Sequence, residues 1–405
     1  MRILFLSQRV PYPPNRGDKI TTWRLIERMA RSHEVTSIAF AHDEDDVRAA
    51  RELERLGVRA LAHRLHPGRA RVASLPLFLT SRPLTLGVYG SRALQADVDR
   101  LAASADLAYA YSSSMGAFVE PHARLPRVMH FAELDSDKWR QYAERTTPPW
   151  SWVYRREHRT LLEFERRIAR SFDENVLCTP LEQRIFEREI PGASSIVLRN
   201  GVDLERFRPA PERAEEGHLV FTGVMDYLPN VDGCVHFAHE VLPRVRERFP
   251  AARFTIVGAR PAAAVRRLER LEGVRVTGFV EDTRDWLSRA ALAVAPLRIA
   301  RGIQNKVLEA LAMGLPLVGT TSATQGIEGR SGEHFLLADE PEAQAEAIVS
   351  LLADPNRARE LGARGRRFVE ERYDWETVLR PLDELLARLA PSPGAAAAGL
   401  RATTL

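Results

Sequence analysis

The segment Ala295–Gly319, APLRIARGIQNKVLEALAMGLPLVG, decides how the rest of the chain is interpreted. An apolar run ends at Pro296, a helical pattern begins near Gln304, and a second apolar run begins at Pro316. This order predicts a strand, a loop, a helix and a further strand. A strand, helix and strand joined in this way are the repeating unit of a parallel sheet.

The loop and helix of this segment carry charges in a pattern that suits a diphosphate. Arg298, Arg301 and Lys306 flank a helix start that contains Gly302. Backbone amides and the helix dipole favour negative charge there, and the cations compensate it without a metal ion. Glu309 lies on a similar face of the helix, where a carboxylate can accept two ribose hydroxyls. The alternative is an ordinary Lys–Glu ion pair on a surface helix.

The rest of the chain repeats the same alternation of short apolar runs and amphipathic segments. The order restarts after Arg199, and the polar segment Pro209–Gly217 with its two prolines is interpreted as a linker. This pattern predicts two parallel sheets with helices on both faces. The predicted strands are Arg2–Leu6, Glu34–Phe40, Val58–Ala62, Asp106–Ala110, Arg127–His130, Glu174–Cys178, Ser195–Leu198, His218–Thr222, Arg253–Val257, Val274–Thr277, Leu292–Ala295 and Pro316–Val318.

The segment Ala295–Gly319 resembles the donor-binding signature of GT-B glycosyltransferases of the group 1 (family 4) type. It matches that signature at Gly302, Glu309, Ala312, Gly314, Pro316 and Val318, and differs at Arg301 and Gln304. A subset of the family reads G-x-x-x-K-x-x-E, which Gly302, Lys306 and Glu309 fit. RNGVDLERFRP at 199–209 and FTG at 221–223 are similar to further parts of the second domain. The combination of MDYLPN with GIQNKVLEALAMG is most similar to sugar transferases of bacterial exopolysaccharide loci.

The resemblance implies an α/β protein with two Rossmann-like parallel-sheet domains that face each other across a cleft. Residues 1–199 would form the acceptor-side domain and residues 200–374 the nucleotide-sugar donor domain. A helix at 375–390 would return to the first domain, and residues 391–405 would form a disordered tail. The implied enzyme is a retaining, metal-independent hexosyltransferase without a cofactor. It would move a sugar from a UDP- or GDP-sugar to a glycan or lipid-linked glycan in exopolysaccharide or cell-envelope polysaccharide synthesis.

Carried onto this chain, the resemblance predicts the residues of the site. The family's usual Arg and Lys after Gly223 are absent, so we hypothesise that the cations of the 298–306 loop supply the missing charge. On the first domain, a structural histidine and helix-capping acids are the alternative to a sugar site. The predicted catalytic residues are His130, Lys306 and Glu309; the donor-binding residues are Gly17, Gly223, Arg298, Arg301, Gly302, Ile303, Gln304, Lys306 and Glu309; the acceptor-side residues are Asp18, Glu133 and Asp135.

Composition narrows the class of protein. With 405 residues, of which 45% are hydrophobic and 28% charged, the chain is typical of a globular protein of two domains. The net charge of +4 comes without a long basic block, so we expect no nucleic acid partner. Cys178 and Cys234 stand far apart, which argues against a disulfide framework or a structural zinc site and favours a reducing cytoplasm. The apolar run at the N-terminus is shorter than that of a signal peptide.

Two further segments of the first domain combine arginines with apolar or acidic residues. Ala73–Tyr89 is apolar and follows Arg64, Arg69 and Arg71. It is interpreted either as a peripheral contact with the anionic inner leaflet of the membrane or as a buried helix and loop. Arg155–Arg170 mixes many arginines with three glutamates and is interpreted as a solvated helix face.

The sequence also bears on four other classes of protein. A dehydrogenase is disfavoured because no G-x-G-x-x-G follows the first strand. A glycoside hydrolase is not supported, because no pair of carboxylates at suitable positions stands out. A nucleotide-sugar epimerase of the same two-domain shape would need acid and base residues on both domains, and no convincing set is present. A non-catalytic nucleotide-binding protein stays open, since Arg301 replaces the first acidic residue of the signature.

Overall fold

The computed structural model describes residues 1–144 and 146–391, which divide into two compact units. The first unit comprises Met1–Leu198 together with the chain from Leu379 onward, and the second comprises Arg199–Val378. The sequence placed the second division after residue 374, so the short segment Trp375–Val378 falls in the second unit and not in the returning helix. The tail predicted at 391–405 lies outside the described residues from 392 onward.

The first unit contains a sheet of seven strands in the order β3-β2-β1-β4-β5-β6-β7. Every strand pair in it is parallel. The apolar side chains of the interior strand β1 are buried on both faces, as expected where helices cover both sides of a sheet. The strands are β1 (Arg2–Ser7), β2 (Glu34–Ala41), β3 (Arg59–Arg64), β4 (Leu107–Tyr111), β5 (Arg127–Ala132), β6 (Glu174–Leu177) and β7 (Ser195–Val197).

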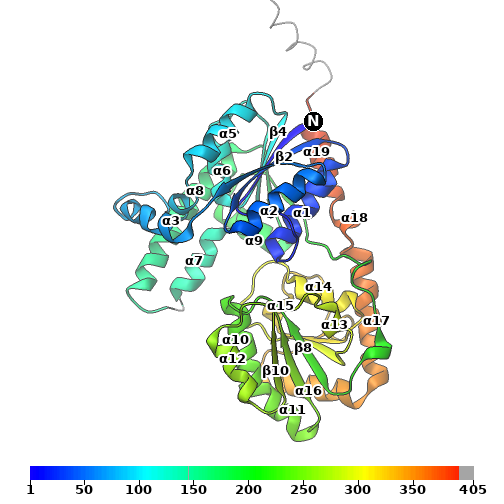
Figure 1. The fold of residues 1–405 in the computed structure, drawn as a ribbon. Coiled ribbons are helices and arrows are strands. Elements are labelled where there is room, and N and C mark those ends of the chain that lie inside the picture. Colours follow the sequence, from blue (N-terminus) through cyan, green and yellow to red (C-terminus); the bar gives the residue numbers. More distant parts are fainter. Residues whose placement is uncertain (145, 392–405) are drawn as a thin grey trace, which may run out of the picture. The chain divides into compact units, whose positions relative to one another are not determined.

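Helices cover both faces of this sheet (Figure 1), and successive residues of β2 alternate between two apolar clusters. Ile38 and Phe40 belong to one apolar cluster, together with residues of the helices between β3 and β6. Ala39 and Ala41 belong to another, with Leu53 of α2. The helices of this unit are α1 (Gly17–Ala30), α2 (Glu44–Arg55), α3 (Pro67–Ser74), η1 (Leu75–Leu79), α4 (Leu84–Val88), α5 (Arg92–Ala102), α6 (Ser113–Val119), α7 (Asp135–Glu144), α8 (Trp150–Ser171), α9 (Pro180–Glu189) and α19 (Arg380–Leu389).

The last helix, α19, belongs to the first unit although it follows the second in the sequence. Leu382, Leu385 and Leu386 on one side of it are buried. Asp383 accepts from the Arg28 guanidinium of α1, with 2.6 Å between Nη2 and Oδ2. Arg388 forms an ion pair with Glu174, a buried carboxylate of β6. The helix is therefore attached by both apolar packing and two ion pairs.

The second unit contains a six-stranded parallel sheet in the order β10-β9-β8-β11-β12-β13. Its strands are β8 (His218–Thr222), β9 (Arg253–Val257), β10 (Val274–Gly278), β11 (Leu292–Ala295), β12 (Leu317–Gly319) and β13 (Leu336–Leu337). Its helices are η2 (Pro211–Arg213), α10 (Leu228–His236), η3 (Phe237–Val241), α11 (Leu242–Arg248), α12 (Ala263–Arg267), η4 (Leu268–Arg270), α13 (Arg284–Leu287), α14 (Asn305–Ala312), α15 (Thr321–Thr324), α16 (Pro341–Ala353), α17 (Pro355–Arg372) and α18 (Trp375–Val378).

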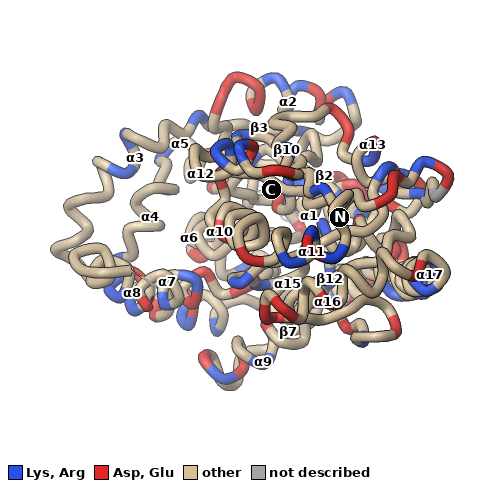
Figure 2. Tube along the Cα trace, turned by 90° about the horizontal axis from the view of Figure 1, so that it is seen from below, with Lys and Arg blue, Asp and Glu red and all other residues tan. Residues whose placement is uncertain are grey.

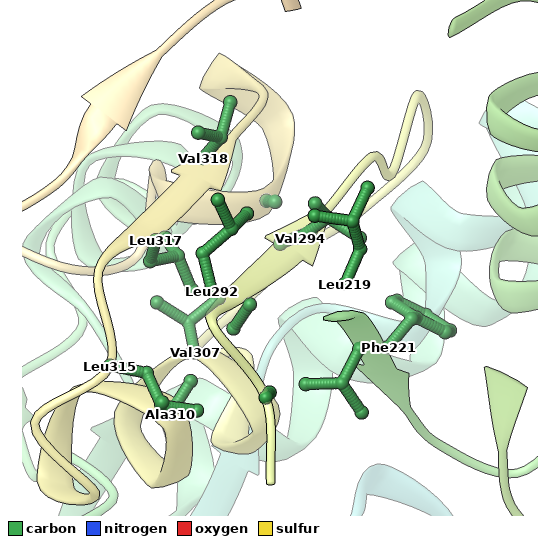
Figure 3. Packing of buried hydrophobic residues seen from close by; sticks show 14 of the residues in the cluster. Leu219, Phe221, Leu292, Val294, Val307, Ala310, Leu315, Leu317 and Val318 are labelled. Carbon is green, nitrogen blue, oxygen red and sulfur yellow. The ribbon is translucent and has the colours of Figure 1, made fainter. Parts of the chain in front are cut away.

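Helix α14 is placed by its apolar face. Val307 and Ala310 are buried in the same cluster as Leu292 of β11 and Leu317 of β12 (Figure 3). Lys306 and Glu309 alternate with these residues and stay partly exposed. The spacing of apolar residues thus orients the helix so that both polar side chains of the signature lie away from the core.

Two sequence-based interpretations differ from the structure. The amphipathic segment Val231–Phe249 predicts one long helix, but the structure has α10 and α11 joined by the π-helical turn η3. The solvated face predicted at 155–170 is wrong for two of its glutamates. Glu157 is buried because its carboxylate accepts from the backbone N–H groups of Leu84 and Thr85, each at 2.8 Å, and Glu165 is buried against the start of α7.

Candidate functional site

The candidate donor site lies at the carboxyl edge of the second sheet, the edge at which ligands bind in open α/β sheets. Gly223 follows β8, and the loop after the neighbouring strand β11 leads to α14. A Cβ on Gly223 would lie 2.7 Å from Nδ2 of Asn230 and 3.4 Å from Cε of Lys306. The structure therefore brings Gly223 and Lys306 together, and only glycine leaves room for Asn230 between them.

Asn230 organises this edge, and sequence reasoning did not assign it a role. Its side chain is 3% exposed. Nδ2 donates to the Val224 carbonyl and Oδ1 accepts from Nζ of Lys306, both at 2.9 Å. The signal in the sequence is a polar residue directly after Pro229, in the first turn of α10. One amide thus fixes both the loop after β8 and the lysine of α14.

Burial weakens the hold of Lys306 on its proton. The pKa of Lys306 is lowered to about 8, because the ammonium is desolvated; Cys234 and Glu309 act in the opposite direction. Nζ also lies 5.1 Å from the ring centroid of Phe221. A desolvated cation with one neutral hydrogen-bond partner retains capacity for an anionic ligand.

Glu309 shares the electrostatic environment of Lys306. Burial raises the pKa of Glu309, while Lys306 and Arg206 oppose that shift. The two side chains of the K-x-x-E pair therefore interact, as their spacing on one helix predicts. This interaction alone is equally compatible with a structural ion pair, so it does not identify the ligand.

The loop before α14 is held by contacts within the second unit. Gly302 has φ of 60°, and its carbonyl oxygen would lie 2.2 Å from a Cβ on Gly326. Gln304 forms the N-cap position of α14 and donates from Nε2 to the Arg301 carbonyl at 2.8 Å. Ile303 is buried in the core of the unit. Of these predicted donor-binding residues, Ile303 and Gln304 shape the loop.

The structure does not bring Arg298 to Lys306. The Arg298 guanidinium binds both carboxylate oxygens of Asp232, with Nε 2.9 Å from Oδ2, and this pairing raises the pKa of Arg298. Both residues line a hollow together with Leu228 and His236 on the outer side of α10. The hypothesis of three cooperating cations is thus corrected for Arg298, whose charge Asp232 already compensates.

His130 does not fit the predicted contact with a sugar. The residue is 1% exposed, and its Nδ1 lies 2.7 Å from the hydroxyl of Tyr109. The ring of Tyr111 packs against it with 4.6 Å between centroids. Burial lowers the pKa of His130 to about 3, so the imidazole is neutral. The alternative of a structural histidine therefore describes this position.

Two of the predicted acceptor-side acids lie near the end of β4. Tyr111 is the last residue of that strand, and Asp18 and Glu133 both raise its pKa in addition to the larger effect of burial. Asp18 follows Gly17, the first residue of α1, and accepts from Nε of Arg16 at 2.6 Å. The structure thus gathers Asp18 and Glu133 at the carboxyl edge of the first sheet.

Asp135 lies at the start of α7 and accepts from Oγ of Ser113 at 2.9 Å. The preceding strand ends leave the sheet through unusual backbone, because Ser112 has φ of 76° and Ala132 has φ of 60°. Non-glycine residues in this region are strained and cluster at functional sites. This edge of the first unit is accordingly the candidate acceptor side.

Among residues 1–144 and 146–391, no three His, Cys, Asp or Glu side chains converge as metal ligands would. None of the helices in these ranges combines the length and hydropathy needed to cross a bilayer.

Comparison with known proteins identifies the fold and the second domain. The family described as "Glycosyl transferases group 1" matches residues 216–354, which contain β8 through α16 and all of the candidate donor site. Solved structures agree over nearly the whole chain. A sucrose-phosphate synthase of Thermosynechococcus elongatus has a TM-score of 0.72 at 19% identity, over 96% of this chain and 99% of its own. HepE of Anabaena in complex with UDP-glucose has a TM-score of 0.70 at 16% identity, over 96% and 100%.

The curated relatives are bacterial glycosyltransferases. The D-inositol 3-phosphate glycosyltransferase 2 of Catenulispora acidiphila is 28% identical over 49% of this chain and 51% of its own. A GDP-mannose-dependent alpha-(1-6)-phosphatidylinositol monomannoside mannosyltransferase of Mycobacterium tuberculosis is 29% identical over 48% and 56%. The chain spans about half the length of the curated relatives it matches. The predicted GT-B fold and group 1 glycosyltransferase domain are confirmed by these findings.

Proposed function

We propose that this protein is a retaining glycosyltransferase that moves a sugar from a UDP- or GDP-sugar to a hydroxyl of a lipid-linked glycan. The observation that carries the proposal is the cluster of Gly223, Asn230 and Lys306, with Glu309 one turn further along α14. It lies at the carboxyl edge of a parallel sheet and inside the segment that matches group 1 glycosyltransferases.

Each member of the cluster has a distinct part in the proposed donor site. Lys306 contacts the diphosphate, and its charge stabilises the negative charge that grows as the bond from sugar to phosphate breaks. The backbone amides at the start of α14 bind the same group. Glu309 accepts the hydroxyls of the ribose. Asn230 is a positioning residue, because it is buried and its Oδ1 holds Nζ of Lys306.

The proposed reaction needs no cofactor and no metal ion. The acceptor oxygen attacks the anomeric carbon on the face from which the nucleotide leaves. As the bond to the diphosphate breaks and the glycosidic bond forms, the acceptor proton passes to a phosphate oxygen of the leaving nucleotide. Protein groups then contribute by positioning and by charge stabilisation. Asp18, Glu133 and Asp135 orient the acceptor.

The names of similar proteins support the choice of substrates. One solved neighbour binds UDP-glucose, and the mycobacterial relative is described as using GDP-mannose and a phosphatidylinositol mannoside. We place the reaction at the cytoplasmic face of the membrane, in the synthesis of exopolysaccharide or another envelope polysaccharide.

The test begins with nucleotide binding to the purified protein. Thermal unfolding is measured with UDP, GDP, ADP and CMP, where a ligand at about 100 times its Kd adds roughly 2.7 kcal/mol of stability. UDP and GDP carry the terminal phosphate charge that a nucleotide sugar develops only as its bond to the sugar breaks. A thermal shift with UDP or GDP is therefore expected, and Lys306→Ala should weaken it while Arg298→Ala preserves it. The matched control works because Arg298 is already paired with Asp232. No thermal shift with any nucleotide, or a shift that is unchanged in Lys306→Ala, would contradict the proposed donor site.

Turnover then separates a transferase from the remaining alternatives. Release of free nucleotide from the matching nucleotide sugar should require an acceptor, and the product should retain the anomeric configuration by NMR. Binding without any turnover would leave a nucleotide-binding protein, the alternative that Arg301 in place of the acidic signature residue keeps open. Conversion of the donor into another nucleotide sugar would indicate an epimerase.

A further inference from the structure

We propose that the first unit docks on an anionic lipid bilayer through an exposed apolar patch formed by Val72, Leu75, Phe78, Leu79, Trp150 and Trp152. The inference concerns the surface that would present this enzyme to a lipid-linked acceptor. It rests on the proposed function for its purpose only, because the patch lies outside the candidate donor site and binding to a bilayer can be measured without catalysis.

Large apolar side chains are exposed together in this part of the molecule. Leu79 is 93% exposed, Trp152 is 63% exposed and Trp150 is 59% exposed. More than half of the large exposed apolar side chains in the described residues belong to the patch. The sequence of Ala73–Tyr89 is compatible with either a buried segment or a membrane contact. The exposure of Leu75, Phe78 and Leu79 argues against burial. Contiguous exposed apolar residues usually mark an interaction site.

Contacts from α8 join the two halves of the patch. Arg156 donates from Nη2 to the Thr80 carbonyl at 2.7 Å, and its guanidinium lies 5.1 Å from the ring centroid of Phe78. The next residue, Glu157, accepts from the backbone of Leu84 and Thr85. The segment around η1 is therefore fixed onto α8 and presents its apolar side chains in a set arrangement.

Helical geometry places one tryptophan on the same side as these contacts. Trp152 lies four residues before Arg156, and residues at this spacing share a helix face. Trp152 thus adjoins the segment that Arg156 holds. In Figures 1 and 2, α3, α7 and α8 lie at the same end of the first unit.

The charge around the patch indicates the partner. The chain has seven arginines and no carboxylate between Glu54 and Asp97, namely Arg55, Arg59, Arg64, Arg69, Arg71, Arg82 and Arg92. Arg69, Arg71 and Arg82 are exposed next to the apolar residues, and the chain near α3 shows blue without red in Figure 2. Arg155 and Arg159 are exposed on α8.

An anionic bilayer surface matches both properties of the patch. Segments that lie in the membrane interface typically have tryptophan and leucine on their apolar side and arginine on their polar side. Arginines near an anionic leaflet add attraction that salt screens. A protein partner would need a complementary acidic and apolar surface, and nothing in the charge pattern favours that over lipid headgroups. An anionic bilayer is therefore the proposed partner of the patch.

The experiment measures co-flotation of the full chain with phosphatidylcholine vesicles that contain or lack phosphatidylglycerol. We expect binding to the anionic vesicles only, with a loss as salt is raised. The double variant Leu79→Ser, Trp152→Ser should weaken binding by at least about tenfold, since two apolar anchors are lost. The double variant Arg69→Gln, Arg71→Gln should weaken it by roughly tenfold or more, because each arginine near the surface contributes about fivefold.

Matched controls come from the same unit. Leu56→Ser removes an exposed leucine outside the patch, and Arg48→Gln removes an exposed arginine of α2; neither should change flotation. The nucleotide-induced thermal shift should be unchanged in every variant, which separates this inference from the proposed function. Equal binding of wild type and the Leu79 and Trp152 variant would overturn the proposal. So would self-association that disappears in that variant while vesicle binding is absent.

Discussion

Lys306 and His130 show what burial does to a single titratable residue. Burial lowers the pKa of both. Lys306 stays partly exposed at the edge of a sheet, with a neutral amide as its hydrogen-bond partner. His130 is enclosed between Tyr109 and Tyr111. In the sequence, His130 ends a predicted strand and Lys306 follows one. The sequence does not tell which of the two side chains is enclosed, because enclosure depends on residues distant in the chain.

Truncation should separate the roles of Glu309 and Lys306. Glu309→Gln should raise the KM for the donor about tenfold to a hundredfold with little change in kcat, since a lost hydrogen bond to a charged group is worth roughly 1.5–3 kcal/mol. Lys306→Ala should lower kcat by on the order of a hundredfold, and Lys306→Arg should restore only part of it. The measurement is steady-state kinetics with the donor varied at saturating acceptor.

Arg298→Ala is the control for this pair and should behave like the wild type, because Asp232 compensates the Arg298 charge. If both test variants change KM alone, Lys306 binds the ground state and its proposed role is wrong. If neither variant changes any constant, the K-x-x-E pair is a surface ion pair.

The lowered pKa of Lys306 predicts that nucleotide binding takes up a proton in alkaline solution. The free protein loses the Lys306 proton as the pH rises through about 8. A bound diphosphate favours the charged form and raises this pKa. Between the two pKa values, binding must therefore restore the proton, and affinity should fall by up to about tenfold per pH unit. Below pH 8 no such dependence is expected from Lys306.

Calorimetry in two buffers of different ionisation enthalpy measures this uptake at pH 9. Nucleoside diphosphate binding should take up a fraction of a proton in the wild type, and Lys306→Arg should abolish the difference between the buffers. Equal uptake in wild type and variant would assign the proton to another group.

At the scale of elements, close backbone contact positions the donor edge. Gly258 follows β9 with φ of 153°, and a Cβ on it would lie 1.6 Å from the carbonyl oxygen of Gly223. The segments after β8 and β9 are thus in direct contact. The sequence predicted β8 and β9 with the bounds that the structure gives them, because buried parallel strands read as continuous apolar runs. It did not predict the contact between their ends, which depends on strand order.

Gly258→Ala should therefore disturb the donor edge as well as the stability of the second unit. The added methyl must displace the backbone at Gly223, so we expect a lowered Tm and a nucleotide affinity reduced by about tenfold or more. Gly278→Ala is the matched control: Gly278 ends β10 with φ of 70°, but a Cβ there meets nothing within 4 Å. It should cost about 1–2 kcal/mol of stability through backbone strain alone and leave affinity unchanged. Similar affinities in both variants would contradict the inference.

The candidate site was predicted at the level of elements more completely than at the level of contacts. The apolar spacing of α14 predicts that Lys306 and Glu309 lie on its polar side, and the structure places them there. The pairing of Arg298 with Asp232 joins a loop to a different helix and leaves no local pattern. The position of Asn230 after Pro229 is visible in the sequence, but its contact with Lys306 joins two helices and leaves no local pattern.

At the scale of the whole molecule, the restart of the strand and helix order after Arg199 predicts two sheets, and the comparisons confirm the GT-B fold. The sequence predicted that the chain rejoins the first unit at residue 375, whereas the division in the structure falls before Leu379. Residues 375–378 and 380–389 both read as helical, and only tertiary packing decides that α18 belongs to one unit and α19 to the other.

The whole enzyme should work without a metal ion. In the proposed site, Lys306 and the amides at the start of α14 compensate the diphosphate, so activity should survive treatment with EDTA. Initial rates before and after chelation, at a fixed donor concentration, test this. Complete loss of activity that magnesium or manganese restores would show that the charge compensation assigned to Lys306 is insufficient.

The ion pair between Arg388 and Glu174 bears on how this protein is made. Glu174 leaves the ribosome before the second unit, and Arg388 leaves it after. At roughly 5–20 residues per second, on the order of ten seconds or more separate the two partners during synthesis. Until then the nascent first unit lacks α19 and the cation that pairs with a carboxylate of β6. During that time the Glu174 carboxylate either stays exposed or is buried without its ion pair. The fold of the first unit is therefore completed only when the last helix has been translated.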